Sequence, residues 1–387
     1  MDLGVYIHFP WCRERCPYCD FAIAIAPLAE IPHQRYADAI LAELEARAPR
    51  YHSRNLVSIY FGGGTPALWR AAQIERVIAA VRARFAAAAP ADLEITVEAN
   101  PNDCTPATLA ALAAAGVNRL SIGAQAFRDE ELVQLGRDHD ARAAAAALAT
   151  ARAAGFARVS LDLIFALPGR SLADWQRTLA RALELGPDHL SVYQLTVEER
   201  TPLYAAVARG EVTPAPDDDC AEQFLAADAA LSKAGYQHYE VSSYARAGAR
   251  ARHNSLYWRG VDYLGLGNGA HSLLRSPDGG AERFGNHRSV VRYLGASPAG
   301  PDAALASDPL VAEHTRLDAA AFAADLVWLG LRTCDGIARA SLPPGAAPEL
   351  ERLRVAGLLT VDDRSVRPTA RGLLFADEVG ARLANEL

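Results

Sequence analysis

The sequence predicts an α/β fold in which a partial (β/α)6 barrel precedes a mostly helical C-terminal part. Two observations predict this fold. Over the first 200 residues, short apolar runs without strict polar alternation are separated by helical stretches, which is typical of parallel strands covered on both faces. After about residue 200 this rhythm stops. Six units are fewer than the eight of a closed barrel, so we expect an open or partial barrel.

The six expected strands are rich in Val, Ile, Leu, Tyr and Phe, and are Val5–Phe9, Leu56–Phe61, Leu93–Glu98, Arg119–Ala124, Val159–Phe165 and His189–Leu195. Helices are expected between them at Gln34–Arg47, Ala71–Phe85, Pro106–Ala115, Ala141–Ala154 and Leu172–Leu185. Gly116, Gly155 and Gly186 follow three of these helices, where glycine ends a helix at little cost. Because ligand sites in such sheets lie beyond the carboxyl ends of the strands, we expect the functional residues there.

The second half of the chain predicts a different architecture. We expect a helix from Asp217 to about Lys233, a strand over Gln237–Tyr244, and loops at 275–280 and 295–301. The last 75 residues are expected to be helical. Within them, a helix over Leu350–Leu359, a turn, a short strand at Val366–Pro368 and a final helix from Ala370 resemble a winged helix. We divide the chain into a core at 1–240 and a C-terminal domain at 241–387.

Composition and charge exclude several classes of protein. The chain has 387 residues, of which 51% are apolar and 22% charged, so it is neither largely disordered nor fibrous. Its net charge is −7, and residues 241–387 are nearly neutral, so we expect no nucleic-acid partner and a structural winged helix. The sequence has no apolar run of about 18 residues and no leader pattern at its start. We therefore expect a cytoplasmic protein without a transmembrane segment.

Three of the six cysteines lie within eight residues, directly after the first expected strand. Cys12, Cys16 and Cys19 have the spacing C-x3-C-x2-C, and the other three cysteines stand alone. Thiolates are soft ligands that suit Fe–S clusters or zinc. Structural zinc takes four ligands, usually from two paired motifs, and the sequence holds no second pair. The spacing therefore favours an Fe–S cluster, with zinc and a redox thiol pair as alternatives.

Polar residues follow the next expected strands in turn. A glycine run, Gly62-Gly63-Gly64-Thr65, follows the second strand, and bare glycines let backbone groups approach a ligand closely. Four polar side chains lie at or near the ends of later strands: Glu98, Gln125, Arg137 and Asp162. Burying one such group unpaired is costly, and local backbone could satisfy any one of them. Four at successive strands favour a shared polar ligand.

Together these segments resemble the radical S-adenosylmethionine (SAM) enzymes. The resemblance implies that Cys12, Cys16 and Cys19 hold a [4Fe–4S] cluster whose open iron binds SAM. It also implies SAM contacts from Gly62, Gly63, Gly64 and Thr65, which would hold the amino group, and from Glu98, Gln125, Arg137 and Asp162. Tyr6, Tyr18 and Thr196 fall at further such positions. In that family an electron from the cluster cleaves SAM to a radical. The sequence of this chain assigns no catalytic residue.

Nearly the whole chain resembles the oxygen-independent coproporphyrinogen III oxidases and their relatives, the haem chaperones. Three features favour the chaperones. Phe21 stands where the oxidases usually have a fourth cysteine, and the chain starts almost on the first strand, without the arm of the oxidases. His253-Asn254-Ser255-Leu256-Tyr257-Trp258 matches a His-Asn-x-x-Tyr-Trp segment of the chaperones, which implies that His253 contacts haem. The alternative is an ordinary loop histidine, and His271 is a weaker candidate for haem.

The expected function is therefore that of a haem chaperone carrying a [4Fe–4S] cluster, SAM and haem. It would pass haem to acceptor apoproteins, with respiratory enzymes among the candidates, and would need an electron donor. We expect a monomer or a homodimer, and peripheral contact with a membrane stays open. The alternative function is that of an oxygen-independent coproporphyrinogen III oxidase, which decarboxylates propionate side chains by radical chemistry.

Overall fold

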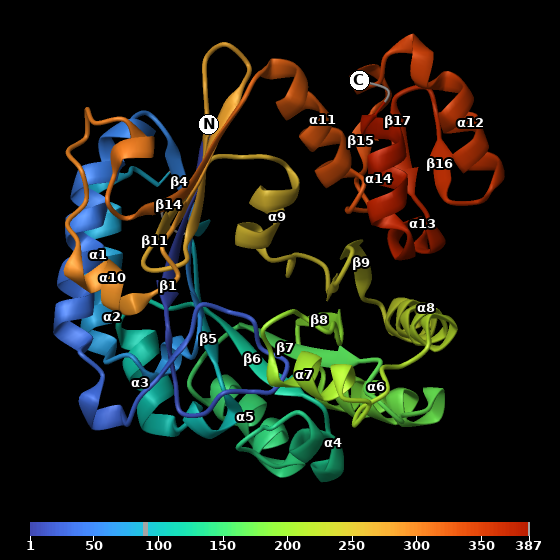
Figure 1. Ribbon diagram of the computed structural model, residues 1–387. Helices are drawn as coiled ribbons and strands as arrows, with labels where there is room; N and C mark the ends of the chain where they lie inside the picture. The colour runs from blue at the N-terminus through green and yellow to red at the C-terminus, as the bar shows by residue number, and fades with distance from the viewer. Residues whose placement is uncertain (88–91, 386–387) are drawn as a thin grey trace.

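The computed structural model describes residues 1–87 and 92–385 and is built around one twelve-stranded sheet (Figure 1). In spatial order its strands are β14 (Val311–Leu317), β13 (Ala281–Asn286), β12 (His271–Arg275), β11 (Tyr263–Leu266), β1 (Asp2–Phe9), β4 (Asn55–Gly63), β5 (Glu94–Ala99), β6 (Arg119–Gln125), β7 (Arg158–Phe165), β8 (His189–Gln194), β10 (Ser243–Ala245) and β9 (Gln237–Glu240). The order is open, with β14 and β9 at its two edges.

All six expected strands form, and each pairs in parallel with the next, from β1 through β4, β5, β6 and β7 to β8. The predicted α/β fold is confirmed. The expected helices connect these strands and cover the outer face of the sheet in Figure 1; they are α1 (His33–Arg47), α2 (Ala71–Arg84), α3 (Pro106–Ala114), α5 (Ala141–Ala153) and α6 (Leu172–Leu185). Ser171 and Asp174 form a capping box at the start of α6, which satisfies backbone donors that a helix start leaves free.

The sheet extends further than the sequence predicts. β11 pairs in parallel with β1 and is followed by three antiparallel strands, β12 to β14. The expectation of a helical C-terminal part is wrong for β14, whose side chains are mostly exposed and therefore give no apolar signal. The expected single strand over Gln237–Tyr244 is also wrong. It divides into β9 and β10, because the Val241 amide bonds instead to the carbonyl oxygen of Arg332.

A buried polar cluster joins the sheet extension to α1. The carboxylate of Glu43 pairs with Arg47 at 2.5 Å and accepts hydrogen bonds from the Asn286 amide at 2.7 Å and the Tyr293 hydroxyl at 2.6 Å. Arg47 also pairs with Asp308 at 3.1 Å. These charges are almost fully buried, so each depends on its partners in the cluster.

The last residues form a small separate layer with its own apolar core (Figure 1). It contains α11 (Ala319–Gly330), α12 (Ala347–Val355), α13 (Ala370–Leu374) and α14 (Ala376–Ala384), and a sheet with the order β15 (Ile337–Ala338), β17 (Ser365–Pro368), β16 (Leu359–Val361). The predicted helix over Leu350–Leu359 is wrong at its end. The chain adopts a left-handed conformation at Gly357, and Leu359 then begins β16. The large sheet contains strands that come before residue 240 in the sequence and strands that come after it. The division into a core at 1–240 and a C-terminal domain at 241–387 therefore stays a prediction.

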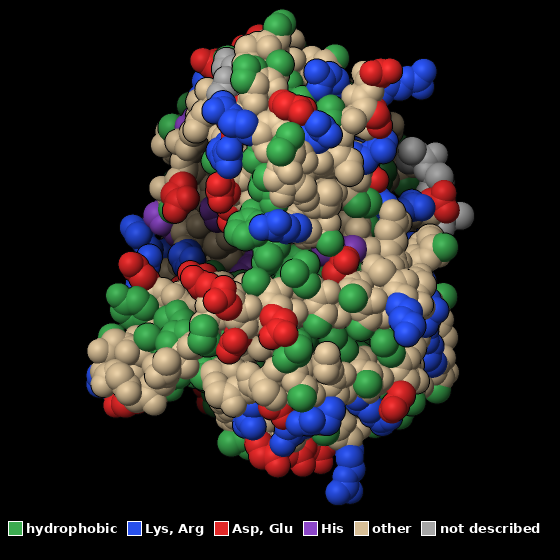
Figure 2. Space-filling view, turned by 90° about the vertical axis from the view of Figure 1, so that its right-hand side faces the viewer, with side chains coloured by type: hydrophobic (Ala, Val, Ile, Leu, Met, Phe, Trp, Pro, Cys, Tyr) green, Lys and Arg blue, Asp and Glu red, His purple; other side chains and the backbone are tan. Residues whose placement is uncertain are grey.

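Two further elements lie between the core and this layer. α8 (Asp217–Lys233) has the predicted bounds, whereas α9 (Arg252–Trp258) was not expected as a helix. The face of the molecule in Figure 2 is hollowed, with acidic and basic side chains around the hollow. Within residues 1–87 and 92–385, none of the helices combines the length and apolar character that crossing a bilayer requires.

Candidate functional site

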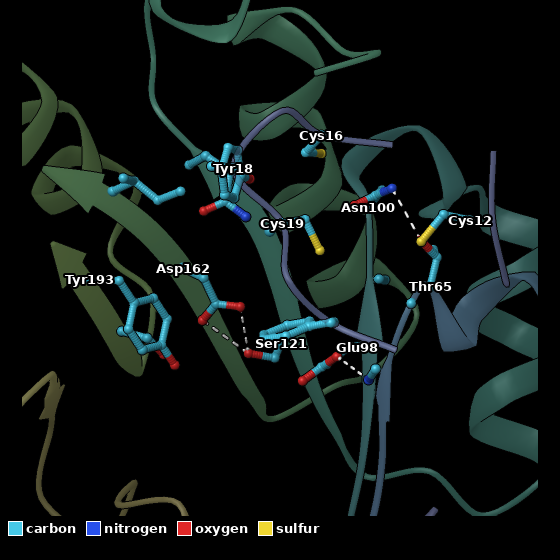
Figure 3. A pocket seen from close by; sticks show the side chains of 18 of the residues that line it. Cys12, Cys16, Tyr18, Cys19, Thr65, Glu98, Asn100, Ser121, Asp162 and Tyr193 are labelled. Atoms are coloured by element: carbon cyan, nitrogen blue, oxygen red, sulfur yellow. Dashed lines mark hydrogen bonds between the residues drawn. The ribbon is translucent and has the colours of Figure 1, made fainter. Parts of the chain in front are cut away.

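A cavity of about 570 Å³ lies at the carboxyl ends of the parallel strands (Figure 3). Its walls come from the cysteine loop after β1, the ends of β4 to β8, and α9. Most of the predicted site residues line it: Cys12, Cys16, Tyr18, Cys19, Gly63, Gly64, Thr65, Glu98, Gln125, Arg137, Asp162 and Thr196. Among the described residues, Tyr6, Gly62 and His253 lie outside this lining.

The three cysteines lie at one side of the cavity, and two of their sulfurs accept hydrogen bonds from neighbouring side chains. The Thr65 hydroxyl donates to Cys12 Sγ at 3.6 Å, and Arg137 Nη1 donates to Cys16 Sγ at 3.3 Å. Asn100 bridges the two donors, since its Nδ2 donates to Thr65 Oγ1 at 3.4 Å and its Oδ1 accepts from Arg137 Nη2 at 2.6 Å. Donors of this kind hold sulfur ligands in place and tune a cluster's potential. Sequence reasoning missed Asn100, although it directly follows β5.

The cysteine loop is anchored by an ion pair. Arg13 lies between Cys12 and Cys16, and its Nη2 is 2.6 Å from Oδ1 of Asp103. Asp103 is buried at the end of a short 3₁₀ turn, Pro101–Asp103, that follows β5. The pair therefore fixes the loop to the strand end that also carries Asn100.

Burial opposes charge on Cys12 and Cys19. It raises the pKa of the Cys12 thiol to about 11, against a lowering by the Thr65 hydrogen bond, and it also raises the pKa of Cys19. These two thiols are therefore protonated at neutral pH unless a cation stabilises the thiolates. Within the described residues, no three Cys, His, Asp or Glu side chains converge as ligands of a single metal ion.

The glycine run is required by packing within the protein. Gly63 has φ +113°, and a Cβ there would lie 2.5 Å from the His8 ring. A Cβ on Gly64 would lie 2.6 Å from the carbonyl oxygen of Pro10. The Gly63 amide donates to Glu98 Oε2 at 3.1 Å. The run thus shapes the cavity wall by bringing β4 against the cysteine loop.

Two carboxyl groups lie at the other side of the cavity (Figure 3). Glu98 accepts from the Tyr60 hydroxyl at 2.7 Å, and Asp162 accepts from Ser121 Oγ at 3.0 and 3.1 Å. Burial raises the pKa of Glu98 to about 7; the Tyr60 hydrogen bond lowers it and nearby Asp162 raises it. Burial also raises the pKa of Asp162. A bound cation would stabilise the charged form of both groups.

Gln125 is strained and incompletely bonded at the cavity wall. It ends β6 with φ +65°, which is rare for a residue other than glycine. Its Oε1 is buried and has no hydrogen-bond partner among the described residues. Thr96 Oγ1 is in the same state and also lines the cavity. Buried polar atoms without partners are expected where a ligand supplies them, so the cavity fits a polar ligand such as SAM.

His253 lies on α9 but is buried against the sheet. Its Nδ1 is 2.8 Å from Ser58 Oγ, and its Nε2 is 2.8 Å from the Tyr257 hydroxyl. Its ring stacks on that of Tyr60, with ring centroids 5.1 Å apart. The Tyr6 ring lies 6.1 Å from that of Tyr60 and 6.3 Å from that of His253. Burial lowers the pKa of His253 to about 3. Both ring nitrogens are therefore occupied by protein groups, and the imidazole is neutral.

Comparisons with known proteins found relatives that cover most of the chain. A family model described as the radical SAM superfamily matches residues 6–182. The chain is 37% identical over 400 residues to "Radical S-adenosyl methionine domain-containing protein 1, mitochondrial" of Bos taurus, covering 99% of this chain and 88% of that protein. It is 42% identical to "Heme chaperone HemW" of Escherichia coli (72% and 71% covered) and 37% identical to that of Mycobacterium tuberculosis H37Rv (97% and 93% covered).

Among solved structures, the coproporphyrinogen III oxidase HemN of Escherichia coli has a similar fold. The TM-score is 0.78 at 24% identity, covering 100% of this chain and 91% of that chain. At this identity the likeness concerns the α/β fold alone.

Proposed function

Because this chain belongs to the radical SAM superfamily, and within it to the family of the HemW haem chaperones, we propose that it binds haem and delivers it to acceptor proteins. The observation that carries the proposal is the identity of 37% over 97% of the chain with a haem chaperone from Mycobacterium tuberculosis. The acceptors are haem-requiring apoproteins, with respiratory enzymes as candidates. We also propose that the protein acts in the cytoplasm, because cysteine thiols stay reduced there.

The large cavity is the proposed site of the cluster and SAM. Cys12, Cys16 and Cys19 hold a [4Fe–4S] cluster, and the donors Thr65 and Arg137 support two of these sulfurs. The polar groups of SAM bind on the side with the carboxyl groups, at Glu98, Gln125 and Asp162, with Tyr18, Thr196 and the glycine run completing the wall. When bound, the cluster and SAM supply one-electron chemistry, for which an electron donor is a required partner.

The role of His253 in haem binding stays a prediction. In the present geometry haem iron reaches its imidazole only after α9 moves and the hydrogen bonds to Ser58 and Tyr257 break. A histidine this deeply packed also contributes to stability, so loss of haem after substitution has to be separated from unfolding.

An anaerobic haem titration of the cluster-reconstituted protein tests the proposal, followed by absorbance. We expect saturation near one haem per chain. His253→Ala is measured beside it, with His52→Ala as a control because His52 is exposed. A folded His253→Ala protein with normal haem affinity removes His253 as a ligand and leaves the chaperone intact. If the native protein takes up no haem and instead consumes coproporphyrinogen III with SAM and a reductant, the oxidase alternative replaces the proposal.

A further inference from the structure

A second cavity of about 420 Å³ lies on the other side of α9, between this helix and the small C-terminal layer. α9 lies between the sheet and that layer in Figure 1. Asn254 of α9 lines the first cavity, whereas Ser255, Trp258 and Arg259 line the second. The two cavities therefore share one helix as a wall but have separate linings. A volume of this size is within the range of pockets for cofactor-sized molecules.

The lining of the second cavity combines apolar side chains with two arginines and one carboxylate, that of Asp335. Its aromatic side chains are Tyr239 and Trp258, and its larger aliphatic side chains are Leu326 and Ile337. Arg250 and Arg259 supply two guanidinium groups. Such a combination fits a flat, largely apolar molecule that carries a carboxylate at its edge, because aromatic rings stack on planar ligands and guanidinium binds carboxylate in a bidentate fashion.

The two arginines differ in their existing partners. Arg250 Nη1 is 2.8 Å from Oδ2 of Asp335, so its charge is already balanced within the protein. Arg259 is exposed and, in the part of the chain that the structure describes, no carboxylate oxygen lies within 4 Å of its guanidinium. Arg259 is therefore the cation of this cavity that remains available to an anionic group.

We propose that this second cavity is the haem site, with one haem propionate on Arg259 and the macrocycle against Trp258, Leu326 and Ile337. The inference rests on the proposed function. Haem matches this lining because it is a flat tetrapyrrole with two carboxylates at one edge. The second cavity would place haem on the side of α9 that carries Trp258. His253 would keep its hydrogen bonds to Ser58 and Tyr257 against the sheet.

The lining has a consequence for how firmly haem is held. The described residues that line the second cavity include no histidine, cysteine or methionine, and the hydroxyl of Tyr239 already bonds to His189 Nε2 and to the Ala251 amide. These four residue types supply the common axial ligands of haem iron. The macrocycle and its carboxylate, rather than the iron, are recognised there. Haem held in this way leaves without the breaking of a strong metal bond, as transfer to an acceptor requires.

The test is a titration with haem and, separately, with iron-free protoporphyrin. Arg259→Glu reverses the free charge, and Ala338→Trp fills the cavity from an exposed position in its lining. We expect Arg259→Glu to bind haem about tenfold to a hundredfold more weakly, the range for loss of a charge-assisted hydrogen bond. We expect Ala338→Trp to bind haem more weakly than the native protein because its indole occupies the space of the macrocycle. Arg142→Glu is the matched control, because Arg142 is exposed on α5 far along the sequence from this cavity, and its haem affinity stays unchanged. Protoporphyrin binds the native protein within a few-fold of haem.

The outcomes separate the site from the function. Iron content and circular dichroism like those of the native protein establish that each variant is folded. If the native protein binds haem and both cavity variants bind it equally well, the site is wrong and the chaperone function stands. Failure of protoporphyrin to bind, with haem binding intact, also overturns the site, because recognition then depends on the iron. If the native protein binds no haem at all, the proposed function itself fails.

Discussion

Glu98 is a buried carboxyl group that changes its charge near neutral pH. Burial raises its pKa to about 7, from an ordinary value near 4.5. Below pH 7 the group is largely neutral, and above it the carboxylate forms. The charged group attracts a cation such as the ammonium or sulfonium of SAM, whereas the neutral acid gives no such attraction.

We therefore predict that SAM binds more tightly as pH rises from 6 to 8, by up to about tenfold, since one pKa unit corresponds to about 1.4 kcal/mol. Glu98→Gln keeps the shape of the neutral acid, so it binds SAM weakly with a flat pH profile. Calorimetry of the cluster-loaded protein measures both. Glu75→Gln, on the exposed side of α2, retains the native profile. A native profile in Glu98→Gln would assign the pH dependence to another group.

Single residues were predictable where spacing carried the signal. The cysteine spacing and the positions of Glu98 and Asp162 in the carboxyl halves of their strands sufficed to place them at one cavity. The position of His253 was not predictable, because it depends on contacts between distant segments. Tyr6 and Tyr60 are neighbours only because β1 and β4 pair in that register, and α9 then packs His253 on Tyr60. Nothing in the His-Asn-x-x-Tyr-Trp segment itself indicates this burial.

At the scale of elements, the cysteine loop depends on its attachment to the turn after β5. Arg13 makes that attachment through Asp103, whereas Arg15, two residues later, is exposed and pairs with no carboxylate among the described residues. Removing Arg13 leaves a buried carboxylate without its cation, at a cost of about 1–3 kcal/mol.

We predict that Arg13→Ala retains less iron after reconstitution and desalting, by about half or more, because the loop that carries Cys12 and Cys16 is no longer fixed. Arg15→Ala loses the same charge from the same loop and retains the native iron content. Iron analysis and the absorbance of the cluster measure the difference. Equal retention in the two variants would show that the loop is held by other contacts.

Elements were predictable where burial imposed an apolar pattern. The six parallel strands lie between helices, so their sequences are continuously apolar and easy to identify. β14 lies at an edge of the sheet and exposes most of its side chains, so its sequence, Val-Ala-Glu-His-Thr-Arg-Leu, gives no such pattern. β11 has only four residues, and its place beside β1 depends on a pairing across more than 250 residues.

At the scale of the whole molecule, the N-terminal and later parts of the chain complete one another. β1 has β4 on one side and β11 on the other. The Glu43–Arg47 pair of α1 needs Asn286, Tyr293 and Asp308 to remain satisfied. A chain that ends at residue 240 lacks all of these groups.

We predict that residues 1–240 alone do not form a stable, soluble monomer. Such a chain exposes the edge of β1. It also leaves the Glu43–Arg47 pair of α1 without Asn286, Tyr293 and Asp308, which complete its hydrogen bonds. The soluble fraction after expression and the size-exclusion elution volume measure the stability and the oligomeric state of this chain. A chain that ends after residue 318 is the comparison, because it keeps β11 to β14 and removes only the C-terminal layer. A soluble, monomeric 1–240 chain that binds a cluster would show that the core is independent.

The pairing of β1 with β11 also bears on how the protein is made. The strand that begins the sheet emerges first from the ribosome, yet its neighbour at residues 263–266 follows more than 250 residues later. At typical synthesis rates, roughly 10 to 50 s pass before β11 exists. During that time a central strand has one unpaired edge beside the newly exposed cysteines. We expect the nascent chain to need protection by a general folding chaperone, and cluster insertion to follow release of the full-length chain.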